Sequence, residues 1–206
     1  MFIILLQGVW VTVQISLIAI FLGLCFGTIL GALNNDNIKL VIITPIIQIY
    51  VSVIRGTPIF VQLLIVYFAL PNALHVNISP FIAGIITLSL NSTAYLAETV
   101  RAGINSVPLE QWESTYILGY SQIKTLRYII LPQAIKKILP AITNELIALI
   151  KESSILMIIG VQELTKTSRE IVARELNPMK IYFFTAALYF IITFTLSQLT
   201  KYLYRG

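Results

Sequence analysis

The residues of this sequence that could do chemistry are carboxylates and an amide inside long apolar segments. Glu145 and Glu152 stand seven positions apart in one segment, and Asn91 and Glu98 stand seven apart in another. This spacing places both members of a pair on one face of a helix. An acidic side chain inside an apolar span normally faces protein or water, and it marks a candidate functional site. A carboxylate there would favour the ammonium or guanidinium group of a ligand.

The composition indicates what surrounds these side chains. Hydrophobic residues make up 57% of the 206 positions and charged residues 11%, whereas a soluble domain carries about 25% charged residues. The pattern is typical of an all-α membrane protein with a single domain over residues 1–206. The net charge of +5 comes from basic residues that flank apolar segments, so no nucleic-acid partner is expected. Cys25 is the one cysteine, and neither a disulfide nor a metal site is expected.

Each acidic pair also has a structural interpretation. Arg101 lies three residues beyond Glu98, and the two side chains could form an ion pair near the membrane surface. Both interpretations of Glu98 stay open. Lys151 precedes Glu152 but is displaced from it by about 100° on a helix of 3.6 residues per turn. Three ionisable groups in one span are costly unless water or partners receive them, so a water-filled path is favoured over internal pairing for Glu145 and Glu152.

Five apolar segments are expected to span the membrane and to position these groups. In the first segment, Gly23, Gly27 and Gly31 recur at every fourth position. Small residues at this spacing allow another helix to approach closely, so we predict a packing face there. The expected spans cover residues 9–33, 41–70, 81–103, 138–160 and 181–203.

The second segment is interrupted by Arg55-Gly56-Thr57-Pro58. Pro58 lacks a backbone donor and disfavours helix at Thr57, while Gly56 permits unusual dihedral angles. We therefore predict a kinked or discontinuous helix, a device that transporters use at functional sites. Alternatively, Arg55 lies at the membrane interface and extends to the lipid headgroups. The sequence leaves this choice open.

The stretch Leu109–Pro132 is the longest part of the chain that is not built to cross a membrane. Ser106 and Pro108 supply a candidate N-cap and a proline for a first short helix. Gly119 and Ser121 offer a stop and a new cap for a second short helix, which is expected to end before Pro132. The two helices would lie on the membrane surface or dock a partner protein, and spacing alone leaves these roles equal. Trp112 and Tyr116 are the candidate interface anchors.

Charge fixes the expected orientation. If residues 109–137 are cytoplasmic, eight cations share that side and four lie opposite, which follows the positive-inside rule. The N-terminus would then be outside and the C-terminus in the cytoplasm. The first set is Lys39, Arg101, Lys124, Arg127, Lys136, Lys137, Lys201 and Arg205, and the second is Lys166, Arg169, Arg174 and Lys180.

The sequence has no motif for catalysis. No G-x-x-x-x-G-K-[ST] loop, H-E-x-x-H pair or G-x-S-x-G elbow is present, and the paired carboxylates all lie in expected spans. An enzyme is therefore not expected. If the chain moves a solute against a gradient, another protein or an ion gradient must supply the energy.

The polar stretch carries a resemblance to a known family. Glu113-Ser114-Thr115, Gly119 and Ile129-Ile130-Leu131-Pro132 resemble the E-A-A-x(3)-G-x(9)-I-x-L-P signature of binding-protein-dependent ABC importer permeases. Ser-Thr in place of Ala-Ala keeps the residues small but adds hydroxyls. Further segments resemble the polar amino acid branch of that family: Arg55-Gly56-Thr57-Pro58, Asn91-Ser92-Thr93-Ala94-Tyr95-Leu96-Ala97-Glu98 and Lys151-Glu152-Ser153-Ser154.

The resemblance implies a five-helix permease in a bacterial plasma membrane that pairs with a second copy or a paralogue. Its cytoplasmic coupling segment, about residues 104–137, would dock on one of two ATP-binding cassette subunits, which hold the ATP and Mg²⁺. This chain would bind no cofactor. An extracytoplasmic solute-binding protein would deliver the substrate. The coupling residues would be Trp112, Glu113, Ser114, Thr115, Tyr116 and Gly119.

For the cargo, the resemblance implies polar amino acids. Asn91, Glu98, Glu145 and Glu152 are the candidates for the substrate path. Because carboxylates favour cations, arginine, lysine and histidine are slightly preferred over glutamine. The alternative is an ion-coupled carrier or channel that uses the intramembrane carboxylates as a relay.

Overall fold

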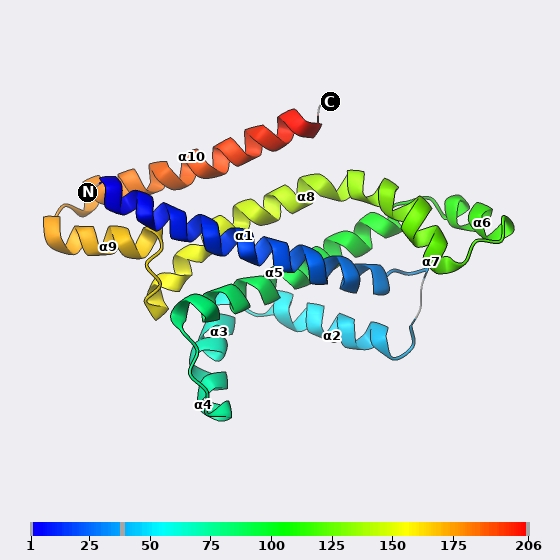
Figure 1. Ribbon diagram of the computed structural model, residues 1–206, viewed down its shortest axis with the longest axis horizontal. Coiled ribbons are helices and arrows are strands. Elements are labelled where there is room, and N and C mark those ends of the chain that lie inside the picture. Colours follow the sequence, from blue (N-terminus) through cyan, green and yellow to red (C-terminus); the bar gives the residue numbers. More distant parts are fainter. Residues whose placement is uncertain (1, 38–39, 205–206) are drawn as a thin grey trace.

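The protein is a bundle of helices joined by short turns (Figure 1). The structure, a computed structural model, describes residues 2–37 and 40–204. Lys39 and Arg205 from the charge count lie outside the described residues. The α-helices are α1 (Phe2–Leu33), α2 (Ile43–Gly56), α3 (Ile59–Leu64), α4 (Leu70–Leu74), α5 (Pro80–Asn105), α6 (Leu109–Ile117), α7 (Gln122–Thr125), α8 (Leu131–Glu152), α9 (Leu164–Glu175) and α10 (Pro178–Tyr204).

Helix α1 packs along α5, and the glycine face predicted in the first span is where they meet. A Cβ on Gly23 would lie 2.6 Å from Ser92 Oγ, and a Cβ on Gly27 would lie 2.8 Å from Leu96 Cβ. A Cβ on Gly31 would collide with the carbonyl oxygen of Ala97. Backbone approaches of this kind are possible only where the side chain is absent. The predicted packing role is confirmed.

The predicted helix break is also confirmed. α2 ends at Gly56, Thr57 is extended with φ −118° and ψ 144°, and α2 makes an angle of 105° with the segment from Ile59 to Leu74. Buried Gln62 serves the freed backbone groups: its Nε2 donates to the carbonyl oxygens of Ile54 (2.7 Å) and Thr57 (3.1 Å). A break at membrane depth requires such internal partners. The helical segment then continues to Leu74, beyond residue 70, where the second span was expected to end.

The expected spans are met in part. By length and composition, three helices of the described chain could cross a membrane (α1, α5 and α10), or four if the bent segment from Ile43 to Leu74 counts as one span. α8 is not among them. It begins at residue 131 rather than 138, and it carries Lys136, Lys137, Glu145, Lys151 and Glu152. Its apolar windows are therefore short, and any part of it at membrane depth needs water or protein around its charges.

The fourth span ends differently from the prediction. The α-helix stops at Glu152, and Ser153–Ile159 forms a 3₁₀ turn instead of helix up to residue 160. The hydroxyl of Ser153 donates to the Ile150 carbonyl (2.9 Å), and that of Ser154 donates to the Lys151 carbonyl (2.7 Å). Such local bonds compete with the regular helix pattern. Gly160, at φ +91°, then ends the turn.

The segment between the fourth and fifth expected spans contains α9, and the first turn of this helix depends on Glu163. This carboxylate is fully buried and accepts bonds from the backbone N–H groups of Thr165 (2.8 Å) and Lys166 (2.7 Å). The hydroxyl of Tyr189 in α10 also donates to it (3.0 Å). Burial raises the pKa of Glu163, although the two backbone bonds oppose this. Glu163 is therefore a helix cap that ties α9 to α10.

Candidate coupling hairpin and substrate path

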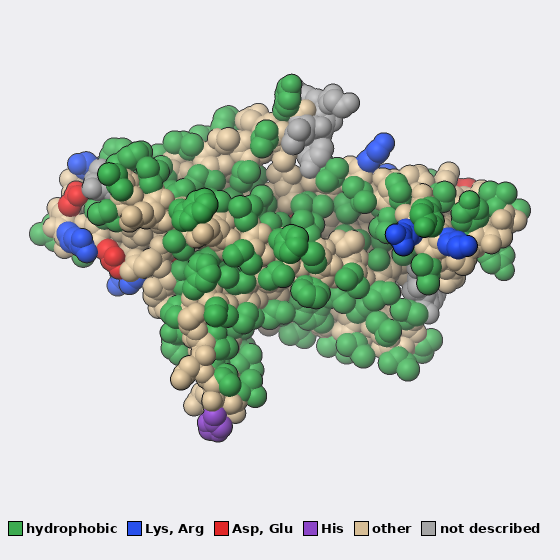
Figure 2. Space-filling view, in the orientation of Figure 1, with side chains coloured by type: hydrophobic (Ala, Val, Ile, Leu, Met, Phe, Trp, Pro, Cys, Tyr) green, Lys and Arg blue, Asp and Glu red, His purple; other side chains and the backbone are tan. Residues whose placement is uncertain are grey.

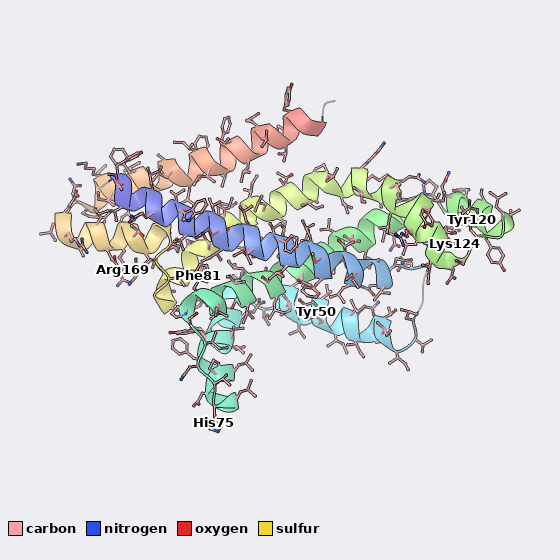
Figure 3. The ribbon with its side chains drawn as sticks, viewed as in Figure 1. Tyr50, His75, Phe81, Tyr120, Lys124 and Arg169 are labelled. Carbon is pink, nitrogen blue, oxygen red and sulfur yellow. The ribbon has the colours of Figure 1, made fainter. Side chains whose placement is uncertain are left out.

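The stretch between α5 and α8 forms a helical hairpin at one end of the molecule. α6 and α7 are joined by a turn at Gly119, whose φ is +78°. The N–H of Gly119 donates to the Tyr116 carbonyl (3.0 Å), and the N–H of Tyr120 donates to the Thr115 carbonyl (3.0 Å). Gly119 takes this left-handed conformation without strain because it has no Cβ. The predicted glycine turn is present, and Tyr120 and Lys124 lie beside it (Figure 3).

Two expectations about the ends of the hairpin helices were wrong. Ser106 does not cap α6, because it ends α5 and its hydroxyl donates to the Gly103 carbonyl (2.7 Å). Extended Pro108 separates it from α6. The second helix does not end before Pro132. It continues through a π-turn, Leu126–Ile130, into α8, and the wider turn accommodates a proline that has no N–H to donate.

The hairpin divides its aromatic and apolar residues between core and surface. The Trp112 side chain is buried, with only 8% exposed, against a cluster that includes Ile104 and Ile130. Its Nε1 has no hydrogen-bond partner among the described residues. By contrast, Tyr116 is 79% exposed, and Ile117 and Leu118 beside it are also exposed. Of the two proposed anchors, Tyr116 projects outward and Trp112 fixes α6 on the bundle.

The Ser-Thr departure from the family signature has a structural counterpart. Thr115 is buried, and its hydroxyl donates to the Trp112 carbonyl (2.8 Å) and accepts from the hydroxyl of Thr125 (3.0 Å). Thr125 is also buried, and it lies on α7. The two threonines therefore bind the hairpin helices together. Ser114 is exposed and bonds only within α6, to the Glu110 carbonyl (2.6 Å).

We expect the replacement Thr115→Ala to destabilise the hairpin by about 1–2 kcal/mol, because it leaves the buried Thr125 hydroxyl without this partner. The double variant Thr115→Ala/Thr125→Ala removes both hydroxyls and should recover about 1 kcal/mol of this loss. Thermal unfolding of the purified protein in detergent, for the two single variants and the double variant, measures the coupling. Strict additivity of the two single effects would mean that the hydroxyls do not act as a pair.

A cavity of about 390 Å³ opens between α6 and α7. Glu113 lines this cavity and is exposed. The other lining residues are Asn37, Trp112, Tyr116, Ile117, Tyr120, Gln122 and Thr125.

On the face of the molecule shown in Figure 2, the middle is mainly hydrophobic, and the charged side chains gather toward the two ends.

The four candidates for the substrate path fall into three separate settings. Buried Asn91 donates to Gln62 Oε1 (3.1 Å) and so ties α5 to the helix break. Glu98 pairs with Arg101 through two bonds, of 3.0 Å from Nε and 2.6 Å from the terminal nitrogen. The ion-pair interpretation of Glu98 is therefore what the structure shows. The partner of Asn91 lies 29 positions away in the sequence, and no local sequence pattern reveals this structural role.

Glu145 and Glu152 remain as the acidic pair of α8. Both side chains are half-buried, and they interact electrostatically with each other. Glu145 also interacts with Ser92 of α5, which is fully buried and faces Gly23 of α1. Two carboxylates of like charge that are partly shielded from water favour a cationic group between them.

The helix break brings Arg55 to α5. Its guanidinium carbon lies 5.3 Å from the centroid of the Tyr95 ring, a cation–π distance. A second cavity, of about 300 Å³, lies between the end of α1, α2 and α5. Both Arg55 and Glu98 line it, although they lie on different helices and no sequence pattern relates their positions. The cavity is lined by Asn34, Gln48, Val51, Ser52, Arg55, Glu98 and Arg101.

Comparison with known proteins decides the family. The family described as binding-protein-dependent transport system inner membrane component matches residues 23–206. The chain belongs to this family. The permease is 37% identical over 202 residues to the glutamine transport system permease protein of Escherichia coli (strain K12), with 98% of this chain and 91% of that protein covered.

Two further comparisons agree with this assignment. The permease is 37% identical over 200 residues to the arginine transport system permease protein of Bacillus subtilis (strain 168), with 96% and 89% of the chains covered. A crystal structure of an amino acid ABC transporter with histidines contains a chain that is 36% identical, with a TM-score of 0.90 and 98% and 93% coverage. The predicted family and the all-α permease fold are confirmed.

Proposed function

We propose that this permease is the membrane subunit of an ATP-driven, binding-protein-dependent importer of polar amino acids. The observation that carries the proposal is the hairpin, in which Gly119 turns the chain and exposes Tyr116 beside Glu113. A short rigid helix with exposed anchors is the kind of element that docks in a groove of another protein. The surrounding helices supply a bundle with acidic groups inside it.

We favour docking on an ATPase over a position on the membrane surface because the hairpin buries one of its aromatic side chains, Trp112, against the rest of the protein. A helix that lies on a membrane turns its aromatic face to the lipid. Here the face with Trp112 and Thr115 is turned to the protein, and the pair Thr115–Thr125 locks the two helices. The exposed face combines Tyr116 and Ile117 with the carboxylate of Glu113. A mixed apolar and charged face of this kind suits a protein partner.

The partners follow from this role. The chain has no P-loop, so ATP and Mg²⁺ would be held by two ATP-binding cassette subunits, and this chain would bind no cofactor. A second copy or a paralogue would complete the membrane pathway, and an extracytoplasmic solute-binding protein would deliver the amino acid. ATP must favour one membrane conformation over the other for transport to occur. The coupling segment, about residues 104–137, would transmit this preference within a single permease domain.

The proposed orientation places the hairpin in the cytoplasm of a bacterial cell, with the N-terminus outside and the C-terminus inside. In Figure 1 the N-terminus and α9 lie at the end of the molecule opposite the hairpin. Described cations near the hairpin, such as Lys124, Arg127 and Lys137, support this orientation by the positive-inside rule. α9 offsets its own cations with acidic residues, including Glu170, which pairs with Lys166 (3.5 Å).

For the substrate, we propose that Glu145 and Glu152 attract the positive end of an amino acid. Every amino acid has an α-ammonium group, so the carboxylates alone do not select a side chain. The relatives above are named for glutamine and arginine transport. A second cation on the substrate would gain from the second carboxylate, which slightly favours arginine, lysine and histidine over glutamine.

We expect Glu145→Gln to reduce ATP-driven uptake of arginine by about tenfold or more, because a charge-assisted bond is lost. The loss should be smaller for glutamine, which has no second cation. The measurement is initial uptake into vesicles that contain the whole complex. Glu175→Gln, an exposed carboxylate at the end of α9, is the matched control. Unchanged uptake in Glu145→Gln would remove this residue from the path.

The function itself is tested with the co-expressed ATPase. Glu113→Arg should abolish copurification of the ATPase and ATP-driven uptake, whereas Glu110→Arg, on the same helix but outside the cavity, should preserve both. Competition among arginine, glutamine and histidine in the same vesicles identifies the substrate. Uptake driven by an ion gradient without any ATPase would instead support the carrier interpretation, in which Glu98, Glu145 and Glu152 relay ions.

A further inference from the structure

The cavity between α1, α2 and α5 is lined by two polar groups that lack a direct partner among the described residues: one lacks a hydrogen-bond donor and the other lacks an ion-pair partner. Asn34 is 4% exposed and lines the cavity, and its Oδ1 has no hydrogen-bond partner among the described residues. A buried acceptor without a donor costs about 1–3 kcal/mol, so its retention calls for an explanation. A ligand that brings an N–H group would supply the missing donor.

The second group without a direct partner is the guanidinium of Arg55. Arg101 is neutralised, because it pairs with Glu98 at 2.6 Å and lies 3.6 Å from the Asp36 carboxylate. Arg55 makes no ion pair within the described part of the chain: its guanidinium lies over the Tyr95 ring and interacts with the Glu98 carboxylate only electrostatically, from beyond contact distance. A guanidinium that lines a cavity and has no carboxylate in direct contact is suited to a carboxylate or a phosphate, which it binds through two parallel bonds.

The walls of the cavity suit a small polar molecule. Gln48 and Ser52 of α2 add neutral polar groups beside Arg55, and Val51 adds one apolar contact. The volume of about 300 Å³ lies at the lower end of the range for small-molecule sites. The required ligand therefore carries an anionic group for Arg55 and N–H donors for Asn34 Oδ1. A free amino acid has both.

We infer that this cavity is a second amino-acid binding site, separate from the carboxylates of α8, in which Arg55 binds the α-carboxylate and Asn34 accepts from a nitrogen of the substrate. The inference rests on the proposed function, because it assumes that amino acids pass through this protein. Asn105 at the end of α5 donates to the carboxylate of Asp36, which follows the end of α1 (2.8 Å). The site thus lies at the hairpin end, where an imported substrate would leave.

The position also connects the site to the hairpin. Arg101 and Asn105 belong to the last two turns of α5, and α6 begins four residues after Asn105. Lys137 of α8 donates to the Ser106 carbonyl in the intervening turn (2.8 Å). A movement of the hairpin is therefore transmitted directly to the helix that holds Glu98 and Arg101. Docking of the ATPase and release of the substrate would be coupled through α5.

The test is equilibrium binding to the whole purified complex, without nucleotide or solute-binding protein, in nanodiscs of phosphatidylcholine and phosphatidylglycerol. The background variant Glu145→Gln/Glu152→Gln removes the α8 carboxylates, and titration with arginine and glutamine then measures the second site. We expect Arg55→Met to weaken this binding by about 10- to 100-fold and Arg55→Lys by much less. Agmatine, which is arginine without its carboxylate, should bind weakly and be insensitive to Arg55→Met.

Arg127→Met is the matched control, because Arg127 also lies over an aromatic ring, Tyr128 at 5.6 Å, but does not line the cavity. It should leave binding unchanged. Asn34→Asp, which keeps an acceptor, should retain binding, and Asn34→Leu should lose it. Equal binding in Arg55→Met and its parent would overturn the inference, as would displacement by phosphatidylethanolamine alone, which would make the cavity a lipid site. If the unaltered complex shows no ATP-driven amino-acid uptake, the proposed function fails as well.

Discussion

Replacement of Gly119 by valine is expected to reduce ATP-driven uptake at least about tenfold while the permease still folds. Gly119 has φ +78°, and a β-branched residue in this left-handed region is strained by about 1–2 kcal/mol. No atom lies within 4 Å of a Cβ built at this position, so the penalty comes from the backbone alone. The turn would relax toward negative φ and change the direction in which α6 presents Tyr116 and Glu113.

Coupling should respond more strongly than stability to this change. Docking in a groove requires the anchors in a fixed place, and misplacement by about 1 Å can reduce a rate 100-fold. We therefore expect at least about a tenfold decrease in uptake and in copurified ATPase. The melting temperature of the permease in detergent should change little, because Gly119 is exposed and packs against nothing.

Two variants separate backbone strain from loss of the hairpin. Gly119→Asn should keep most of the activity, since asparagine tolerates the left-handed region better than other residues. Gly160→Val is the matched control, because Gly160 also has a positive φ (+91°) and open space around a Cβ, but it ends the 3₁₀ turn after α8. It should leave ATPase copurification intact. If Gly119→Val couples as well as Gly119→Asn, the turn does not set the docking geometry.

The parts of the fold that were predictable are those fixed by single residues acting on the backbone. α2 ends before Pro58, which removes a donor and restricts the residue that precedes it. Gly119 likewise marks a turn by its own conformational freedom. The glycines of α1 mark a helix contact because the neighbouring helix can approach this closely only where a side chain is absent. At these positions the signal is local and does not depend on a partner elsewhere in the sequence.

What sequence could not supply was the identity of partners on other helices. Gln62 satisfies the helix break and also accepts from Asn91, 29 residues away. Glu163 is buried because Tyr189 reaches it from α10. Neither pairing leaves a periodic signal. Trp112 shows the reverse case. An aromatic residue at helical spacing suits an interface and a core equally, and the packing of α5 and α8 around Trp112 decides that it is buried.

The same distinction explains the error at Pro132. A proline after an apolar run normally predicts a helix end. Here the π-turn before it shifts the hydrogen-bond register, so that the N–H of Leu131 bonds to Leu126 and the helix continues into α8. The consequence is functional in the proposed mechanism: α7 is continuous, through the π-turn, with the helix that carries Glu145. Movement of the hairpin would therefore be transmitted to the acidic pair as well as to α5.

Replacement of Gly27 by leucine is expected to prevent assembly of the bundle. A Cβ at Gly27 would lie 3.0 Å from the Thr93 carbonyl oxygen and 3.1 Å from the Ala97 nitrogen, both backbone atoms that cannot turn aside. The helices α1 and α5 must then separate along their shared face. Overpacking typically costs about 1–3 kcal/mol, and a whole leucine against backbone belongs at or above the upper limit. We expect little folded permease by size-exclusion chromatography of detergent extracts.

Gly56→Leu is the matched control for this prediction. Gly56 is also a helix glycine, at the end of α2. However, no atom comes within 4 Å of a Cβ built there, and its backbone is not left-handed. The variant should therefore be extracted and elute as the unaltered protein does. Because Ser92 of α5 faces Gly23 of α1 and also lies near Glu145 of α8, separation of α1 from α5 should disturb the surroundings of Glu145. A folded Gly27→Leu variant with normal uptake would show that this contact does not hold the path in place.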